Sequence, residues 1–346
     1  MDPTLNVALV GYGFVGKVFH APLIVHTPGL RLHTVVSRDA GKVHADHADV
    51  CVVADAENAF ADPEIDLVVI AAPNAVHAPL AEAALGQGKH VVVDKPFTVT
   101  LQEAEQVVAR AAGAQRLLSV FQNRRWDADF LTVRKLIDEG ALGEVVEFHS
   151  HFDRYRPVVT DRWREQDQPG AGLWYDLGPH LLDQALQLFG MPEGITADIA
   201  LQRDGARAPD YFHATLRYPK LRVVLHAGAL VAAHGLRFAV HGARASYMKH
   251  GMDPQEDALR SGQPPASADW GRDPRPGTLH VGERDGIPVA SVPGDYVRYY
   301  ALLREAILHG TSPPVTATQA LEVMSMLEWG MRSSAGRREI ACELGF

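Results

Sequence analysis

The chain has 346 residues, of which 47% are hydrophobic and 22% charged, as in an ordinary globular protein with a sizeable buried core. Its 33 basic and 42 acidic side chains leave a formal net charge of −9, which argues against a nucleic-acid or anionic-membrane partner. No run approaches the roughly 18 consecutive apolar residues that a transmembrane helix needs.

The cysteines and the first residues indicate the compartment. The two cysteines, Cys51 and Cys342, are far apart in the sequence, have no metal-ligand spacing and cannot form a disulfide framework. Residues 1–5 lack the basic-then-apolar order of a secretion signal. We therefore expect a cytoplasmic protein, with Cys51 buried as a small side chain in the apolar run 50–53.

The first 122 residues alternate short aliphatic runs with amphipathic stretches. Such alternation predicts a parallel sheet that is covered by helices on both faces. Helices are expected at 76–87 and 101–112. The expected strands are 6–10, 31–36, 50–53, 67–72, 90–94 and 117–121.

After Phe121 strands follow one another with short turns, which predicts a mainly antiparallel sheet in an α+β domain. The expected strands are 144–153, 195–203, 210–218, 221–231, 236–241 and 244–249. The expected helices are 127–139, 173–189, 294–309 and 316–334, and long loops are expected at 250–290. The sequence thus predicts a parallel α/β domain at 1–122 and an α+β domain at 123–346. An open face of the second sheet would favour a homo-oligomer, a dimer or a tetramer.

A glycine-rich turn with the pattern G-x-G-x-x-G follows the first expected strand. Gly11 permits the tight turn, Gly13 lets the backbone approach a pyrophosphate, and Gly16 permits close helix–strand packing. Free N–H groups at the start of the next helix would face the phosphates. This order of strand, turn and helix predicts a Rossmann-type dinucleotide site formed by Gly11, Tyr12, Gly13, Phe14, Val15 and Gly16.

The end of the second expected strand indicates which dinucleotide binds. An NAD site places an acidic residue about 20 positions past the glycines, but here Ser37 and Arg38 occupy that place. Ser37 can donate a hydrogen bond to a 2′-phosphate and Arg38 can fork onto it, so we expect NADP rather than NAD. The neighbouring Asp39 is expected to cap the next helix. The alternative for Arg38 is a solvated surface side chain.

Two later strand ends carry further candidates for the cofactor site. Pro73, Asn74 and His77 follow the fourth expected strand and would contact the ribose or the nicotinamide, unless His77 only begins a helix. Asp94 and Lys95 follow the fifth strand. The Lys95 ammonium can hydrogen-bond a substrate hydroxyl and stabilise the alkoxide that forms as hydride leaves. The alternative for Lys95 is a solvated loop residue.

A second group of chemically active side chains lies in the expected helix 173–189. Asp176, His180 and Asp183 stand at i, i+4 and i+7 and would share one helix face. A carboxylate one turn before an imidazole can orient it, which suits His180 to general acid–base catalysis near neutral pH. The alternatives are a metal site, a polar helix face and a buried polar network. We assign no metal to this triplet or to the histidine pair in 149–151.

A polar cluster of arginines and aromatic residues lies between the expected domains, at 122–126, 154–157 and 163–164. Such side chains can both hydrogen-bond and stack on a polyhydroxylated ring, and ion pairs between the domains are the alternative interpretation. We expect Asn123 to contact the cofactor. The residues expected to contact a small-molecule substrate are Lys95, Arg125, Trp126, Tyr155, Asp176 and His180.

These motifs resemble those of the Gfo/Idh/MocA oxidoreductases along nearly the whole chain. The D-K-P sequence at 94–96 is similar to the family's E-K-P motif, with aspartate where glutamate is usual. The segment 175–183 is similar to the family's D-x-G-x-H-x-x-D helix. The resemblance implies that Lys95, Asp176 and His180 are the catalytic residues.

Within the family the chain is most similar to the NADP-dependent scyllo-inositol dehydrogenases. The similarity rests on the segments 123–127, 154–157, 163–164, 210–213 and 255–260. It implies hydride transfer between NADP(H) and a hydroxyl or ketone of a cyclic polyol or sugar. The alternatives are a dehydrogenase or reductase of another sugar or carbonyl compound, and a non-catalytic sensor that binds the dinucleotide.

Overall fold

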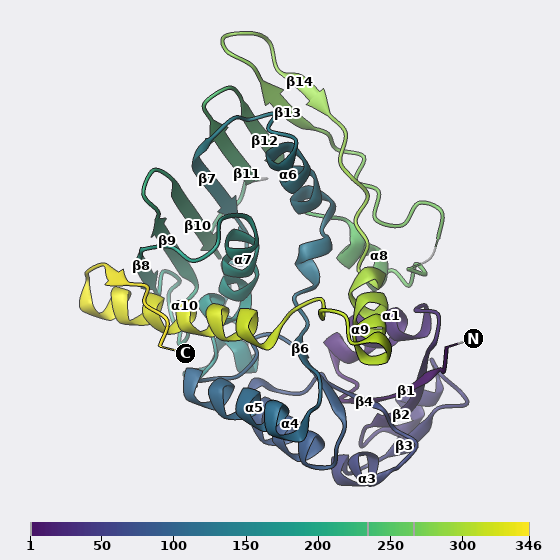
Figure 1. Ribbon diagram of the computed structural model, residues 1–346. Coiled ribbons are helices and arrows are strands. Elements are labelled where there is room, and N and C mark those ends of the chain that lie inside the picture. Colours follow the sequence, from purple (N-terminus) through teal and green to yellow (C-terminus); the bar gives the residue numbers. More distant parts are fainter. Residues whose placement is uncertain (1, 234, 266, 346) are drawn as a thin grey trace. The chain divides into compact units, whose positions relative to one another are not determined.

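The computed structural model describes residues 2–233, 235–265 and 267–345, which form two compact units (Figure 1). The first unit comprises Met1–Asn123, Gln255–Trp270 and Asp295–Leu321. The second comprises Arg124–Pro254, Gly271–Gly294 and Glu322–Phe346. Two late segments of the chain therefore belong to the first unit. None of the described helices is both long and apolar enough to cross a bilayer.

The first unit is built on a six-stranded sheet with the order β3-β2-β1-β4-β5-β6. All neighbouring strands pair in parallel, so the prediction of a parallel sheet is confirmed. Central strands such as β4 are buried along their whole length, because helices cover both faces of the sheet. The strands are β1 (Leu5–Val10), β2 (Leu30–Val36), β3 (Cys51–Val53), β4 (Leu67–Ile70), β5 (His90–Val93) and β6 (Leu118–Val120).

The helices of the first unit cover this sheet, with α4 and α5 on one side and α1 and α9 on the other (Figure 1). The longest, α5, starts with a capping box in which Thr100 and Glu103 each accept a hydrogen bond from the other's backbone N–H. The helices are η1 (Gly16–His20), α1 (Ala21–Val25), α2 (Ala40–His44), α3 (Ala56–Ala61), η2 (Asn74–Val76), α4 (His77–Gly86), α5 (Leu101–Ala114), α8 (Gln255–Arg260) and α9 (Val297–His309).

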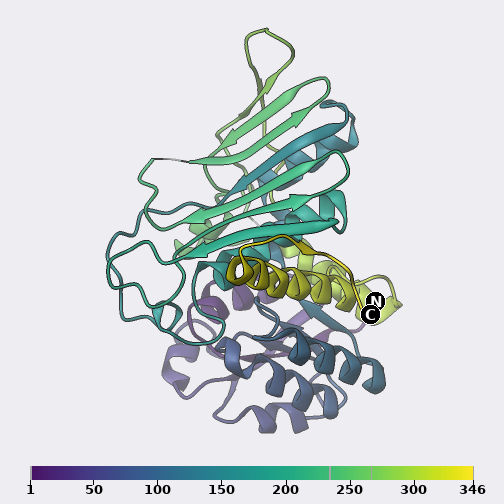
Figure 2. The ribbon, with the colours of Figure 1, turned by 90° about the vertical axis from the view of Figure 1, so that its left-hand side faces the viewer.

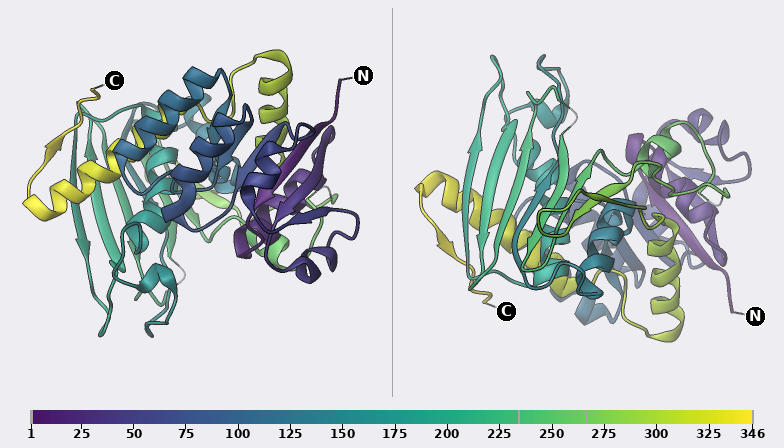
Figure 3. Two further views of the ribbon diagram at one scale, coloured as in Figure 1. Left: turned by 90° about the horizontal axis from the view of Figure 1, so that it is seen from below. Right: turned by 90° about the horizontal axis from the view of Figure 1, so that it is seen from above.

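The second unit is built on a nine-stranded sheet with the order β14-β13-β12-β11-β7-β10-β9-β8-β15. Its long strands lie side by side in both panels of Figure 3. Among the described strands of this sheet only β7 and β10 pair in parallel, so the sheet is mixed and mostly antiparallel, as predicted. The strands are β7 (Val145–His151), β8 (Gly194–Ala200), β9 (Tyr211–Arg217), β10 (Arg222–Gly228), β11 (Leu236–Gly242), β12 (Ser246–His250), β13 (Gly277–His280), β14 (Ile287–Val289) and β15 (Ile340–Ala341).

One face of this second sheet carries the core of the unit. The Trp174 ring of α7 packs edge-on against Phe212 of β9, with ring centroids 5.0 Å apart. Alternate residues of β9 point to the opposite face, which no described helix crosses (Figure 2). The helices that contribute to this unit are η3 (Asn123–Trp126), α6 (Ala128–Asp138), η4 (Trp163–Glu165), α7 (Leu173–Phe189) and α10 (Ala317–Gly336), of which η3 and α10 begin in the first unit.

Two expectations from the sequence are wrong. Cys51 is exposed rather than buried, because β3 is an edge strand of its sheet. The stretch 250–290 is not only loop, since it contains α8, β13 and β14. The first residue of β13, Gly277, lies so close to the Tyr247 ring that a Cβ there would be 2.1 Å from the phenol oxygen, so a side chain would not fit at this position.

The close packing of the glycine turn in the first unit can be tested by adding one methyl group. A Cβ at Gly16 would lie 2.1 Å from the Gly11 carbonyl oxygen, so the backbone must shift. We expect Gly16→Ala to lower the free energy of unfolding by about 1–3 kcal/mol in urea denaturation. Gly113→Ala in α5 is the control, because a Cβ there would meet no described atom within 4 Å apart from its chain neighbours and the backbone of its own helix. Equal stability of the two variants would refute the packing role.

Candidate active site

The carboxyl ends of the parallel strands bring the predicted cofactor residues to one edge of the first unit. The glycine turn follows β1, Ser37 follows β2, Pro73 follows β4 and Lys95 follows β5. Because β1 lies between β2 and β4, the strand order reverses beside the glycine turn. Open parallel sheets bind their ligands at such a switch point.

The glycine turn is pressed against the protein at two points and is open at the third. Gly11 has φ +98°, and a Cβ there would lie 2.4 Å from the Ala71 carbonyl oxygen. Gly16 is equally tight, as described above. At Gly13 a Cβ would meet no described atom within 4 Å apart from its two chain neighbours. The open position is the one at which the sequence predicts approach of a pyrophosphate, so the turn fits a dinucleotide.

A group of charged side chains that sequence reasoning missed lies beside this turn. The Asp46 carboxylate accepts a 2.9 Å hydrogen bond from the Tyr12 hydroxyl and lies 2.7 Å from the Lys17 ammonium. The hydrogen bond from Lys17 holds the pKa of the Asp46 carboxyl below its usual value. Lys42 donates a 2.9 Å hydrogen bond to the Tyr12 carbonyl oxygen. Two lysines therefore stand next to the backbone that would carry the phosphates.

The end of β2 has the arrangement that the sequence predicts for Asp39. Its carboxylate accepts a 3.0 Å hydrogen bond from the Lys42 backbone N–H and so caps α2. The Ser37 hydroxyl oxygen accepts a 3.1 Å hydrogen bond from the Asp39 N–H. Arg38 is exposed. The acidic side chain is thus engaged at the start of the helix, whereas the basic one faces solvent at the end of the strand.

Of the residues after β4, Pro73 is exposed, whereas Asn74 and His77 are buried. His77 begins α4, and its two ring nitrogens lie 2.9 Å from the carbonyl oxygens of Pro96 and Ala72, respectively. The imidazole therefore ties the turn after β4 to the turn after β5. This contact makes His77 a positioning residue, and its contact with the cofactor stays a prediction.

Asp94 is a buried anion beside Lys95. Its carboxylate oxygen lies 3.6 Å from Nε2 of His20, whose Nδ1 lies 2.6 Å from the Tyr300 hydroxyl. Burial opposes ionisation of Asp94, but His20 and the charge of Lys95 hold the pKa of the carboxyl below its usual value. Sequence reasoning missed both residues: His20 ends η1, the helical turn after the glycines, and Tyr300 lies in α9.

In the second unit α7 spans the residues that the sequence predicts for it and carries the acid–base candidates. The half-buried Asp176 carboxylate lies 3.9 Å from the Arg154 guanidinium and 3.8 Å from that of Arg164. His180, one turn further on, is buried with 5% of its surface exposed. The helix therefore presents a carboxylate among cations and an imidazole shielded from water.

Arg125 and Asp183 form a buried, two-pronged ion pair within the second unit. Nε and Nη2 of Arg125 donate hydrogen bonds of 2.9 and 2.6 Å to the two carboxylate oxygens. Glu322 interacts with this pair. Burial raises the pKa of the Glu322 carboxyl, and the positive charge of Arg125 partly opposes the rise. The structure thus uses Arg125 to hold α7, and its contact with a substrate stays a prediction.

A second buried arginine, on β11, holds the same helix and was missed in the sequence. Arg237 donates 2.8 Å hydrogen bonds to Ser150 of β7 and to the side-chain oxygen of Gln184 on α7. Its Nε lies 3.2 Å from the Asp129 carboxylate on α6. Gln184 in turn donates to the Arg124 carbonyl oxygen at 2.8 Å. Buried charge thereby links α7 to the strands β7 and β11, to helix α6 and to η3.

The remaining predicted contacts differ in their exposure. Asn123 and Trp126 lie in η3 and are buried, with 5% and 9% of their surfaces exposed. Tyr155 is 60% exposed and forms an isolated β-bridge with Leu230. Of these three, Tyr155 offers the most surface for stacking on a sugar or polyol ring.

Removing the carboxylate of the buried pair should be costly. Asp183→Ala leaves the buried Arg125 guanidinium without this anion, and we expect the free energy of unfolding to fall by about 3–5 kcal/mol in chemical denaturation. Asp204→Ala, at an exposed position before β9, should change it by no more than about 0.5 kcal/mol. If the two variants were equally stable, the ion pair would not hold α7.

Comparisons with known families match both units. Residues 5–122 match the oxidoreductase family with an NAD-binding Rossmann fold. Residues 134–342 match the C-terminal alpha/beta domain of the same Gfo/Idh/MocA family. The two matches cover the glycine turn, Lys95 and the helix that carries His180.

Individual relatives match along nearly their whole length. The uncharacterised oxidoreductase YdgJ of Escherichia coli (strain K12) is 53% identical over 97% of this chain and 98% of its own. The scyllo-inositol 2-dehydrogenase (NADP(+)) IolW of Bacillus subtilis (strain 168) is 40% identical over 98% of this chain and 96% of its own. The solved structure of YPO2259 from Yersinia pestis is 52% identical, with a TM-score of 0.96 over 100% of this chain and 99% of that one. The chain therefore belongs to the Gfo/Idh/MocA family and is an NAD(P)-dependent oxidoreductase.

Proposed function

We propose that this oxidoreductase transfers hydride between NADP(H) and a ring hydroxyl or ketone of a cyclic polyol resembling scyllo-inositol. The observation that carries the proposal is the strand edge of the first unit, where an open Gly13 and the half-buried Lys95 follow strands of one parallel sheet. The name of the relative IolW supports the choice of substrate and cofactor. Lys95 and His180 belong to different units, and membership of the family supports their action on one substrate.

The residues of this chain would divide the work of alcohol oxidation as follows. The bound nicotinamide supplies the hydride acceptor. His180 takes the proton of the hydroxyl group as general base, which suits a buried imidazole. The Lys95 ammonium stabilises the negative charge that develops on the same oxygen. Asp176, held between two guanidinium groups, orients the substrate or the imidazole.

NADP rather than NAD is the cofactor that the end of β2 favours. The position of an NAD-type carboxylate is taken by Ser37, and the Asp39 carboxylate caps α2 instead of facing a ribose. Arg38 is exposed and Lys42 lies beside the glycine turn, so two cations are available for a 2′-phosphate. A free ribose hydroxyl would gain little from such a charge distribution.

Polar and aromatic side chains of the second unit support a polyhydroxylated substrate. The Arg164 guanidinium lies over the Trp163 ring at 5.0 Å, and the same arginine approaches Asp176. Trp163 is 36% exposed. Charged groups beside an exposed indole can both hydrogen-bond ring hydroxyls and stack on the ring's apolar face.

The assignment of the catalytic residues predicts a loss of turnover. We expect Lys95→Ala and His180→Ala each to lower kcat for NADP reduction by inositols about 10²- to 10⁴-fold, because each removes a group that handles the reacting proton or charge. Turnover is followed by the absorbance of NADPH. Lys220→Ala and His309→Ala, at exposed positions, should keep wild-type turnover.

Near-wild-type turnover in either Lys95→Ala or His180→Ala would contradict the assignment of that residue to catalysis. Activity of the wild type with aldoses but not with inositols would keep the mechanism and overturn the substrate class. Tight NADPH binding without any turnover on inositols, aldoses or their ketones would favour a sensor.

The cofactor assignment predicts a change in preference. The double substitution Ser37→Asp and Arg38→Gln should weaken NADP binding about 10- to 100-fold, since it removes charge-assisted hydrogen bonds to the 2′-phosphate, and should weaken NAD binding far less. Binding of both dinucleotides is measured by calorimetry. Arg31→Gln, an exposed change on the same strand, is the control. Equal losses for NADP and NAD would remove Arg38 from the phosphate site.

A further inference from the structure

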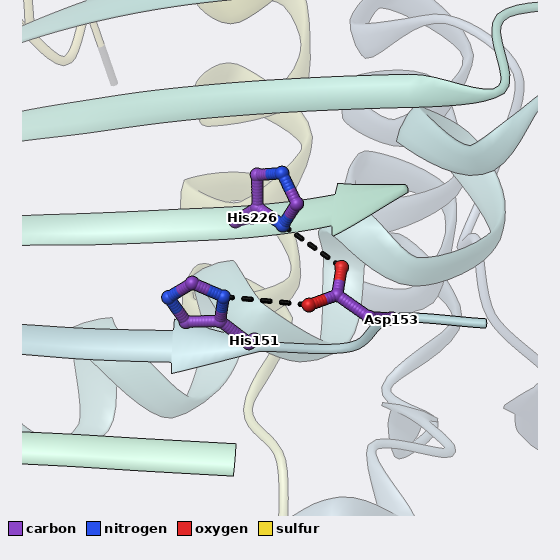
Figure 4. A group of neighbouring side chains, drawn as sticks. All are labelled: His151, Asp153 and His226. Atoms are coloured by element: carbon purple, nitrogen blue, oxygen red, sulfur yellow. Dashed lines mark ion pairs between the residues drawn. The ribbon is translucent and has the colours of Figure 1, made fainter. Parts of the chain in front are cut away.

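Three side chains converge on the face of the nine-stranded sheet that no described helix crosses (Figures 2 and 4). Nδ1 of His151 lies 3.4 Å from one carboxylate oxygen of Asp153, and Nδ1 of His226 lies 2.8 Å from the other. One ligand atom from each residue lies within 4.8 Å of the other two. Among the described residues this is the group of histidine, cysteine or acidic side chains spaced to hold a metal ion.

Strand pairing brings these residues together. His151 and His226 are direct partners in the parallel pair of β7 and β10, so their imidazoles emerge from the same face of the sheet. Asp153 follows the end of β7 and turns its carboxylate toward both rings (Figure 4). The Gly228 backbone N–H donates a 3.0 Å hydrogen bond to this carboxylate and holds it in place. Two of the proposed ligands therefore stand on paired strands, and the third, just past the end of β7, is held by a backbone hydrogen bond.

We propose that His151, Asp153 and His226 bind a divalent transition-metal ion, for which Zn²⁺ is the probe. Two imidazoles and a carboxylate are ligands that Zn²⁺ accepts, at about 2.0–2.2 Å from each ligand atom. Ligand atoms around a tetrahedral ion at that distance are about 3.3 Å apart. The 3.4 and 2.8 Å distances run to different oxygens of Asp153, but one ligand atom from each residue can be chosen so that all three lie within 4.8 Å of one another. Binding an ion would therefore need the ligand atoms to move together by at most about 1.5 Å. The fourth position is left to water.

The surroundings suit an ion that is partly shielded. The side chains of His151, His226 and Asp153 are 22%, 17% and 8% exposed, so an ion can reach them from solvent while few water molecules compete for it. The Tyr211 ring lies edge-on to His226 with centroids 5.3 Å apart, and His149 stacks on His151 at 6.1 Å. These neighbours restrict the orientation of both imidazoles, as supporting groups around a metal site do.

From the sequence we assigned no metal to the histidine pair in 149–151. The alternative to a metal site is that the two histidines and the aspartate form only an ion-pair cluster. Calorimetric titration of the chelator-treated, dialysed protein with Zn²⁺ separates the two. We expect one tight equivalent in the wild type. Asp153→Asn, which keeps an acceptor for the Gly228 N–H, and His226→Gln should each weaken this binding at least about 100-fold, the upper limit for loss of a merely supporting residue. His241→Gln is the control, because this imidazole lies on the neighbouring β11 and bonds Ser246 instead.

A melting experiment on the same proteins guards against unfolded variants. Zn²⁺ should raise the Tm of the wild type and of His241→Gln but not of Asp153→Asn, because an ion stabilises only a fold that binds it. Unchanged affinity in both Asp153→Asn and His226→Gln, or no tight equivalent in the wild type, would overturn the proposal and leave an ion-pair cluster. Because neither readout involves NADP or a polyol, the outcome is independent of the proposed function.

Discussion

The parallel order of the first sheet is the constraint on which the cofactor side of this protein depends. Parallel strands end at one edge, so the turns after β1, β2, β4 and β5 meet there although they are far apart in the chain. The turn after β1 must then pass between neighbouring backbones. Gly11 and Gly16 have no space for a Cβ, whereas Gly13 has open space around it. The packing that closes the turn at two points thus leaves it open at the third.

Buried charge has the corresponding role in the second unit. Arg125 binds Asp183 on α7 through two hydrogen bonds, and Arg237 joins the next residue of that helix, Gln184, to the sheet. Burial of such groups is costly unless their partners are in place, so a shift of α7 that separated them would be penalised. Asp176 and His180, on the same helix, are presented in a defined orientation as a result.

Several motif residues support the site through contacts within the protein, among them His77, Asp94, Arg125 and Asp183. Asp94, where the family usually has glutamate, remains an anion close to His20 and adjacent to Lys95. Its shorter side chain thus retains a negative charge next to the lysine. A match to a motif identifies the family, whereas the contacts of each side chain show what it holds in place.

Short sequence patterns were enough to predict much of this structure. Aliphatic runs marked the six parallel strands, helical spacing marked the bounds of α7, and the glycine pattern marked the dinucleotide turn, because each signal lies within one short segment. Only the tertiary structure decided which segments become neighbours. It placed Cys51 on an edge strand, His20 beside Asp94, Arg237 under α7 and His226 beside His151. Strand order and pairing set these contacts, and they join residues that no local pattern connects.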